Sequence, residues 1–356
     1  MTNRRGFLAG LLATGLAPVP VWADVGAPKY LTAAKLLNGQ FRLFGLSDRG
    51  LSLFDIALPG RGHAAAAHPI RAEAVAFARR PGTFAVILDC TTGRDIARLT
   101  APAGRHFYGH GVFTANGDWL LTTENDIESG EGRLGIWDTT QSYRRVSDIS
   151  SGGIGPHDIA MLPDGETFVI ANGGIETHPD SGRAKLNIPT MLPNLTCLNA
   201  NGVVLDQVTL GRMLHKNSIR HLDVRSDGLI SFAMQYQAED QYPPLMGLYR
   251  PDNGVRLLEA PAEFARDSDN YAAGAAFSRD GTQVGYASPR GGIVHRFHVD
   301  TGAFIDQISA VDVSGLVAGG RGFLATTGQG SVLDIGSDVQ FRHQADVAWD
   351  NHLVAI

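Results

Sequence analysis

The stretch HDIAMLPDGETFVIA, residues 157–171, contains two apolar runs joined by Pro163-Asp164-Gly165. Strand-like runs separated by such a turn are typical of a β-hairpin. Similar hairpins recur along the chain, with spacings of 31 to 63 residues between their turns. The other turns are placed at Gly82, Gly117, Gly228, Gly281, Gly320 and Asn351.

Seven repeated units of about 45 residues, each with room for four strands, predict an all-β fold, a seven-bladed β-propeller. One blade cannot bury its own faces, so the units must close into a ring. The early strands FRLFGLSDRG and LSLFDIAL, residues 41–58, are expected to pair with the C-terminal hairpin in one shared blade. A ring of six or eight blades is the alternative, because the unit near Gly320 has a weak pattern.

The beginning of the chain has the pattern of an export signal. TNRRGFLAG, residues 2–10, places two arginines before a short apolar run, and small residues precede a cleavage point after Ala23. This pattern predicts a twin-arginine signal peptide over residues 1–23 and a single propeller domain over residues 24–356. The mature protein is then expected in the periplasm, with no membrane insertion after signal removal.

Composition limits the possible partners. The formal net charge of -6 provides no basic surface for nucleic acid. The two cysteines, Cys90 and Cys197, lie in apolar strand-like runs and are expected to be buried thiols. The sequence contains no Cys-x-x-Cys-His motif, which excludes covalent c-type haem attachment.

Four histidines occupy one register relative to the predicted turns. His110, His157, His221 and His343 each precede a turn by seven or eight residues, and Glu73 has a comparable position before Gly82. In a propeller this distance reaches the top of the innermost strand, so these side chains are predicted to gather at the channel mouth. The alternative is a structural histidine in each blade, as in WD-type repeats.

The loop of residues 171–194 is longer than a turn requires, and long loops are often functional. It is expected to bring His178 close to His157 and to supply Arg183. Arg220, Arg290 and Gln235 are expected at the same face as binding residues for a cofactor or an anionic metal complex. The remaining histidines are interpreted as surface or turn residues: His63, His68, His106, His215, His295, His298 and His352.

Imidazoles together with carboxylates suit iron, copper, zinc or nickel. The predicted ligand set is the five histidines at 110, 157, 178, 221 and 343 with Glu73, and iron or copper is the expected metal. Because neutral imidazole is the ligand, binding is expected to weaken as the pH falls through the range near 6.5.

Several segments together resemble a family of uncharacterised exported bacterial propellers. They are the twin-arginine start, HGVFTANGDWLLTTENDIESGEGRLGIWD, PHDIAMLPDGETFVIANGGIETHPDSGR, NSIRHLDV and MQYQ. Members of that family tend to be encoded near imelysin-type iron-regulated proteins and dihaem oxidoreductases. The resemblance therefore implies a periplasmic role linked to iron or another metal, with imelysin-type uptake proteins as partners, but it implies no reaction.

Three functions remain open from the sequence. The first is a binding or accessory protein in iron or other transition-metal acquisition. The second is a metal-dependent hydrolase of the lactonase type, which would use the same channel mouth for metal ligands or acid–base groups. The third is a scaffold for protein docking. No catalytic residue is assigned, because the chain has no nucleophile elbow, phosphate loop or dinucleotide fingerprint.

Overall fold

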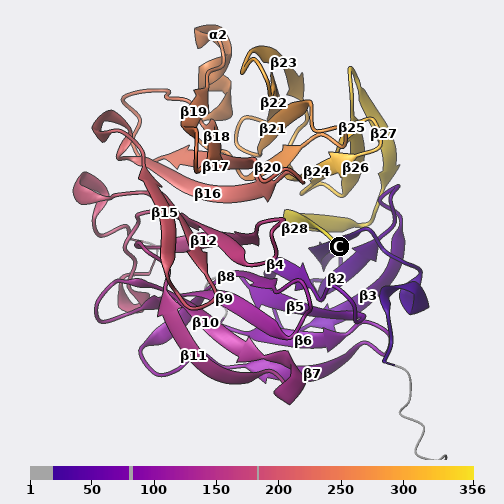
Figure 1. The fold of residues 1–356 in the computed structure, drawn as a ribbon. Helices are drawn as coiled ribbons and strands as arrows, with labels where there is room; N and C mark the ends of the chain where they lie inside the picture. Colours follow the sequence, from indigo (N-terminus) through magenta and orange to yellow (C-terminus); the bar gives the residue numbers. More distant parts are fainter. Residues whose placement is uncertain (1–18, 80–82, 183) are drawn as a thin grey trace, which may run out of the picture.

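The computed structural model describes residues 19–79, 83–182 and 184–356. Its strands form seven four-stranded antiparallel sheets arranged as the blades of a ring, as predicted (Figure 1). The first four blades in ring order consist of β28 (Val347–Ala355), β1 (Tyr30–Leu36), β2 (Phe41–Leu46) and β3 (Ser52–Leu58); β4 (Gly62–Ala67), β5 (Glu73–Ala78), β6 (Ala85–Asp89) and β7 (Arg94–Leu99); β8 (Arg105–Phe113), β9 (Trp119–Asp126), β10 (Gly132–Asp138) and β11 (Arg144–Ser150); and β12 (Pro156–Met161), β13 (Thr167–Asn172), β14 (Asn194–Asn199) and β15 (Val204–Thr209).

The other three blades complete the ring. They consist of β16 (Asn217–Val224), β17 (Ile230–Tyr236), β18 (Met246–Arg250) and β19 (Gly254–Leu258); β20 (Gly274–Phe277), β21 (Gln283–Ser288), β22 (Ile293–His298) and β23 (Phe304–Ser309); and β24 (Val313–Gly319), β25 (Gly322–Thr327), β26 (Ser331–Ile335) and β27 (Val339–Gln344). Helices are short: α2 (Ala262–Ala265) and the 3₁₀ turns Trp22–Val25, Thr139–Gln141, Pro179–Ser181, Ile188–Thr190, Arg212–Leu214 and Arg266–Ser268.

The core lies between the blades. In the described chain, seven hydrophobic clusters each join strands of two neighbouring blades. The middle strands are therefore covered on both faces, and every residue of Thr167–Asn172 is buried. This explains why such strands are continuous apolar runs with little alternation.

The last strand closes the ring. β28 pairs antiparallel with β1, with Tyr30 opposite Ala355, and the Thr32 hydroxyl donates a hydrogen bond of 2.8 Å to the His352 carbonyl. In Figure 1 the yellow C-terminal strand lies beside the indigo N-terminal strands. The predicted shared blade is thus confirmed, although the chain's end supplies one strand where the sequence analysis expected a hairpin.

Two hairpins were assigned to the wrong strands. The runs on either side of Gly82 are β5 and β6, the second and third strands of their blade, and the innermost strand is β4. Asn351 lies inside β28 and is not a turn. The reason for the first error is that β4 reads GHAAAA, and alanine-rich runs have a weak strand propensity.

The segment before the first blade contacts the propeller. The Pro20 carbonyl accepts a hydrogen bond of 2.9 Å from the Ala72 amide, and the Trp22 indole donates one of 2.7 Å to the His68 carbonyl. Residues 1–18 of the predicted signal lie outside the described residues, and cleavage after Ala23 stays a prediction. Within the described ranges, no helix is long and apolar enough to cross a bilayer.

Removal of residues 347–356 is expected to abolish cooperative folding. The deletion takes Trp349 and Leu353 out of the cluster that joins the closing blade to the β24–β27 blade, which would expose apolar surface on both sides of an open ring. The measurement is thermal unfolding followed by circular dichroism, with full-length His352→Gln as the control that keeps the strand. A truncated monomer that melts cooperatively near the wild-type temperature would contradict this role of β28.

Candidate metal site in the propeller channel

A β-bulge interrupts the innermost strand of most blades at one level. In β4, β8, β12 and β28 a register shift contains His63, His110, His157 and His352, respectively. In β16 the shift falls at Arg220, and His221 directly follows it. In a regular blade strand, side chains point to the two sheet faces that neighbouring blades cover. Because a bulge breaks this alternation and re-aims a side chain, it can turn one histidine per strand toward the channel axis.

The five imidazoles form one cluster, here called the histidine cluster. The ring of His110 lies 4.8 Å from that of His352, 5.0 Å from those of His63 and His157, and 6.1 Å from that of His221 (centroid distances). The five strands belong to adjacent blades, and β20 and β24, the innermost strands of the remaining two blades, contain no histidine.

Two groups of three histidines within the cluster could hold a metal ion. The ligand nitrogens of His110, His157 and His221 lie within 4.8 Å of one another, as do those of His63, His110 and His352. At metal–nitrogen distances of about 2.0–2.1 Å, tetrahedral ligands lie about 3.4 Å apart, so the three nitrogens of a group would move closer together when an ion binds. His110 belongs to both groups. Since one nitrogen coordinates one ion, the two groups cannot both bind a metal through the same nitrogen of His110 at the same time.

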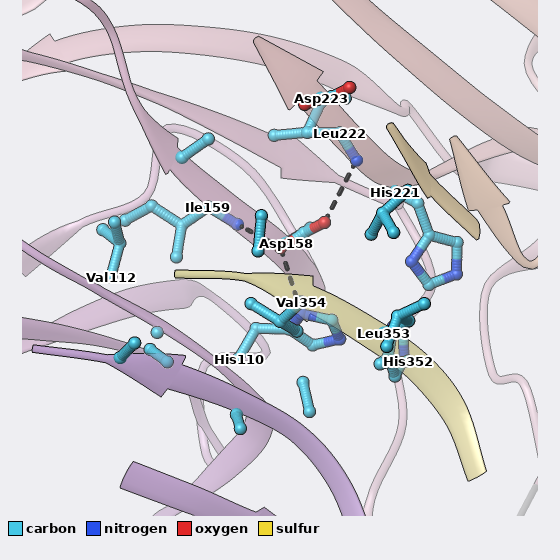
Figure 2. Close-up of a pocket in the computed structure, with 18 of the residues that line it drawn as sticks. His110, Val112, Asp158, Ile159, His221, Leu222, Asp223, His352, Leu353 and Val354 are labelled. Atoms are coloured by element: carbon cyan, nitrogen blue, oxygen red, sulfur yellow. Dashed lines mark hydrogen bonds and ion pairs between the residues drawn. The ribbon is translucent and has the colours of Figure 1, made fainter. Parts of the chain in front are cut away.

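Hydrogen bonds orient two members of the first group. His110 Nδ1 lies 3.0 Å from Asp158 Oδ1, and His157 Nδ1 lies 3.1 Å from the Arg220 carbonyl (Figure 2 shows the first pair). Nδ1 is thereby the donor in each ring, which leaves Nε2 as the lone-pair atom. Among the described atoms, the buried His110 Nε2 has no hydrogen-bond partner. A carboxylate or carbonyl behind a histidine is the usual outer-shell arrangement of metal ligands.

Asp158 is itself held by the backbone. Its carboxylate accepts hydrogen bonds from the Ile159 amide (2.9 Å) and the Leu222 amide (3.0 Å), as the dashed lines of Figure 2 indicate. Burial opposes ionisation, but the neighbouring His110 and the hydrogen bond from the Leu222 amide lower the pKa of Asp158. The carboxylate is therefore a fixed negative charge behind His110.

Burial lowers the pKa of four cluster histidines. For His221 it lowers the pKa to about 3, and His63, His157 and His352 have pKa values well below the usual one. Repulsion from neighbouring imidazoles and from Arg79 or Arg220 adds to the effect. These imidazoles are thus neutral at pH 7 and can bind a metal. Protons compete with the metal for them only below about pH 6.5, the value near which the sequence analysis expected binding to weaken.

A polar cavity of about 420 Å³, here called the upper chamber, lies on one side of the cluster. His63, His157, His221 and His352 are among its lining residues. The same lining includes four cationic side chains and several amide and phenol groups: Arg79, Lys185, Arg220, Arg290, Tyr108, Gln235, Gln237, Asn270 and Tyr271.

A second cavity of about 450 Å³, the lower chamber, lies on the other side. It is lined by all seven innermost strands and contains many small apolar side chains, including Ala64 to Ala67 and Val112. His110, His221 and His352 also line this chamber (Figure 2). The histidine cluster therefore divides the propeller channel into two parts of different chemistry.

The structure brings together three of the predicted metal ligands, His110, His157 and His221. The predicted cofactor-binding residues Arg220, Arg290 and Gln235 line the upper chamber. Arg183 lies outside the described residues.

Three other predicted ligands lie elsewhere. His343 is on β27, the outermost strand of its blade. Its predicted place in the channel is wrong, because it was counted from a turn at Asn351 and this residue lies inside β28. Glu73 begins the second strand of its blade and bonds to Arg71 and to the Tyr143 hydroxyl. His178 is partly exposed, and its Nδ1 accepts a hydrogen bond from the Asp180 amide.

Sequence reasoning missed His63 and His352, which it placed on the surface or in turns. A better signal is the distance to the end of the innermost strand. His352 lies four residues before Ile356, as His110 lies four residues before Thr114, where the turn begins. The two cysteines are free and buried as expected, and burial raises the pKa of Cys90 to about 12 and that of Cys197 to about 11.

An Asp158→Asn variant is expected to bind metal about 10- to 100-fold more weakly than the wild type, because it removes the charge behind His110 and one acceptor for the backbone amides. The measurement is Zn(II) affinity in competition with a chelator of known strength. Asp164→Asn, in the exposed turn after β12, is the matched control. A Cu(II) electron paramagnetic resonance spectrum that is the same in Asp158→Asn and the wild type would show that Asp158 positions a ligand without binding the ion. Equal Zn(II) affinity in Asp158→Asn and Asp164→Asn would contradict the role of Asp158.

The fold and the cluster define the protein as a seven-bladed propeller with a histidine-rich channel. Residues 56–356 match a family described as "Protein of unknown function (DUF1513)", and the chain belongs to that family. A comparison with curated proteins finds no match. Among solved structures, hydrazine synthase of Kuenenia stuttgartiensis is similar over 93% of this chain and 98% of its own, with 13% identity and a TM-score of 0.59, which supports the propeller fold alone.

Proposed function

We propose that this protein binds one transition-metal ion in its channel, through His110, His157 and His221. We further propose that it is a periplasmic binding or accessory protein in the acquisition of iron or another transition metal. The observation that supports metal binding most directly is His110, whose Nδ1 is paired with Asp158 while its buried Nε2 has no hydrogen-bond partner among the described atoms. A buried polar atom without a partner is costly, and a metal ion would satisfy it.

The donor set limits the choice of metal. The three ligands are imidazoles, which suit zinc, copper, nickel and iron, whereas calcium and magnesium prefer oxygen ligands. The role in iron acquisition, with imelysin-type partners, rests on the resemblance of the sequence to exported propellers.

Titration of metal-free protein with Fe(II), Fe(III), Cu(II) and Zn(II) at about pH 7.5 tests the proposal. We expect one ion per chain, with Cu(II) bound more tightly than Zn(II) or Fe(II), as the general order of stability for divalent ions requires. Metal analysis of protein purified from the periplasm then identifies the ion that is bound in the cell. Failure to bind any of these ions after reconstitution would contradict the proposal and favour a docking scaffold.

A metal-dependent hydrolase of the lactonase type is the second candidate. The observation in its favour is the upper chamber, because a three-histidine site beside an open cavity leaves a coordination position for water or substrate. Hydrolysis of lactones or esters by metal-loaded protein, lost in a His157→Ala, His221→Ala variant, would favour the enzyme over the binding protein. Tight metal binding without turnover would favour the binding protein.

A further inference from the structure

The upper chamber has a strong excess of positive charge. Its lining includes Arg79, Lys185, Arg220 and Arg290, and no aspartate or glutamate occurs among the lining residues that the structure describes. Asp350 forms an ion pair of 3.2 Å with Arg79, while the Arg290 guanidinium lies 3.8 Å from Asp269 and over the ring of Tyr271. A chain with a net charge of -6 thus concentrates cations where a bound metal would add more positive charge.

The cations face a common space. Burial lowers the pKa of Lys185, and the charges of Arg220 and Arg290 lower it further. The Arg220 carbonyl accepts a hydrogen bond of 3.1 Å from His157 Nδ1, which connects the cationic wall of the chamber with the histidine cluster. Mutual repulsion of this kind is relieved when an anion occupies the space between the cations.

The neutral lining limits the anion further. Tyr108, Tyr271 and Asn270 add aromatic and amide groups beside the arginines, and the cavity of about 420 Å³ is near the lower end of the range for small-molecule sites. Arginine forks match the planar geometry of carboxylates, and aromatic rings can cover a short carbon skeleton. These properties suit a small organic acid better than a compact inorganic ion.

We infer that the upper chamber binds a small organic carboxylate, held by Arg220, Arg290 and Lys185, and that one of its oxygens completes the coordination of the metal at His110, His157 and His221. The metal contact rests on the proposed function, whereas the anion site in the chamber does not. By thermodynamic linkage, the metal and the carboxylate must each raise the affinity for the other by the same factor.

Isothermal titration calorimetry with malonate as the probe tests this inference on metal-free and Zn(II)-loaded protein. We expect malonate to bind the metal-free protein weakly, with an affinity that falls as salt rises, and to bind the Zn(II)-loaded protein at least about tenfold more tightly. An Arg220→Gln, Arg290→Gln variant should lose about tenfold or more in malonate affinity and bind Zn(II) alone at least as tightly as the wild type, because two cations that repel the metal are removed. Arg94→Gln, Arg144→Gln makes the same chemical change at two exposed strand ends and should behave as the wild type.

Equal malonate affinity in the wild type and the Arg220, Arg290 variant would overturn the anion site. Tighter binding of inorganic phosphate than of malonate would overturn the assignment to a carboxylate. Malonate binding that depends on both arginines, in a protein that binds no Zn(II), would support the anion site and overturn the metal contact together with the proposed function.

Discussion

A His110→Ala variant is expected to lose metal affinity by more than 100-fold. His110 belongs to both three-histidine groups, so its removal leaves neither group complete. The loss should exceed the roughly 10- to 100-fold cost of losing an outer-shell partner, because here a ligand itself is removed. Competition with a chelator measures the affinity for Zn(II) and Cu(II).

Two further variants make this result interpretable. Removal of His110 also takes away a partner of the buried Asp158 and can destabilise the fold, so a His63→Ala, His157→Ala double variant serves as an independent test. It breaks each group once and leaves the pair of His110 and Asp158 in place. His343→Ala, on the outermost strand β27, should bind metal as the wild type does. If His343→Ala weakens binding as much as His110→Ala, the histidine cluster is not the metal site.

The metal-free protein is expected to lose stability steeply as the pH falls below about 6.5. The pKa values of His63, His157, His221 and His352 are lower in the folded protein than in the unfolded chain. The unfolded state therefore binds more protons in this range, and acid favours unfolding. The contribution of these histidines to the free energy of unfolding is fully present above about pH 6.5. It decreases as the pH falls toward the folded-state pKa, which is about 3 for His221.

The expected loss of stability is large for a change of one pH unit. Each such histidine contributes up to about 1 kcal/mol between pH 6.5 and 5.5, so the four together contribute on the order of 3 kcal/mol when partial exposure is allowed for. Thermal unfolding in the presence of a chelator measures the effect as a fall in the melting temperature. A His63→Gln, His352→Gln variant should show about half the fall, and a melting temperature that stays constant from pH 7.5 to 5.5 would contradict buried neutral imidazoles.

The blade count and the joining of the chain ends were predictable because turn residues between apolar runs recur with a visible period. His110, His157 and His221 were predictable from their constant distance to these turns. His63 and His352 were missed, because an alanine-rich strand hides its own beginning and because Asn351, a residue type typical of turns, lies inside β28. Nor could the bulges be read from the sequence, because a bulge is a property of the pairing between two strands and becomes visible only when their register is known.

The upper chamber was predictable only in part. Arg220, Arg290 and Gln235 follow from the register of strands and loops, but the chamber also requires Tyr108, Asn270 and Tyr271 from connections between blades. Such connections vary in length, so no period in the sequence relates their positions. The same holds for Asp158, whose role depends on backbone amides from two blades.

The two unlike chambers make the channel directional for ions. A cation that leaves the histidine cluster through the lower chamber would pass the carboxylates of Asp158 and Asp223, which lie among apolar side chains such as Ala64 to Ala67. The upper chamber offers tyrosine and amide oxygens along the way and space for a negatively charged ligand. The four cations of the upper chamber would repel a bare metal ion, so exchange on that side would depend on the anions present there, whereas exchange through the lower chamber would not.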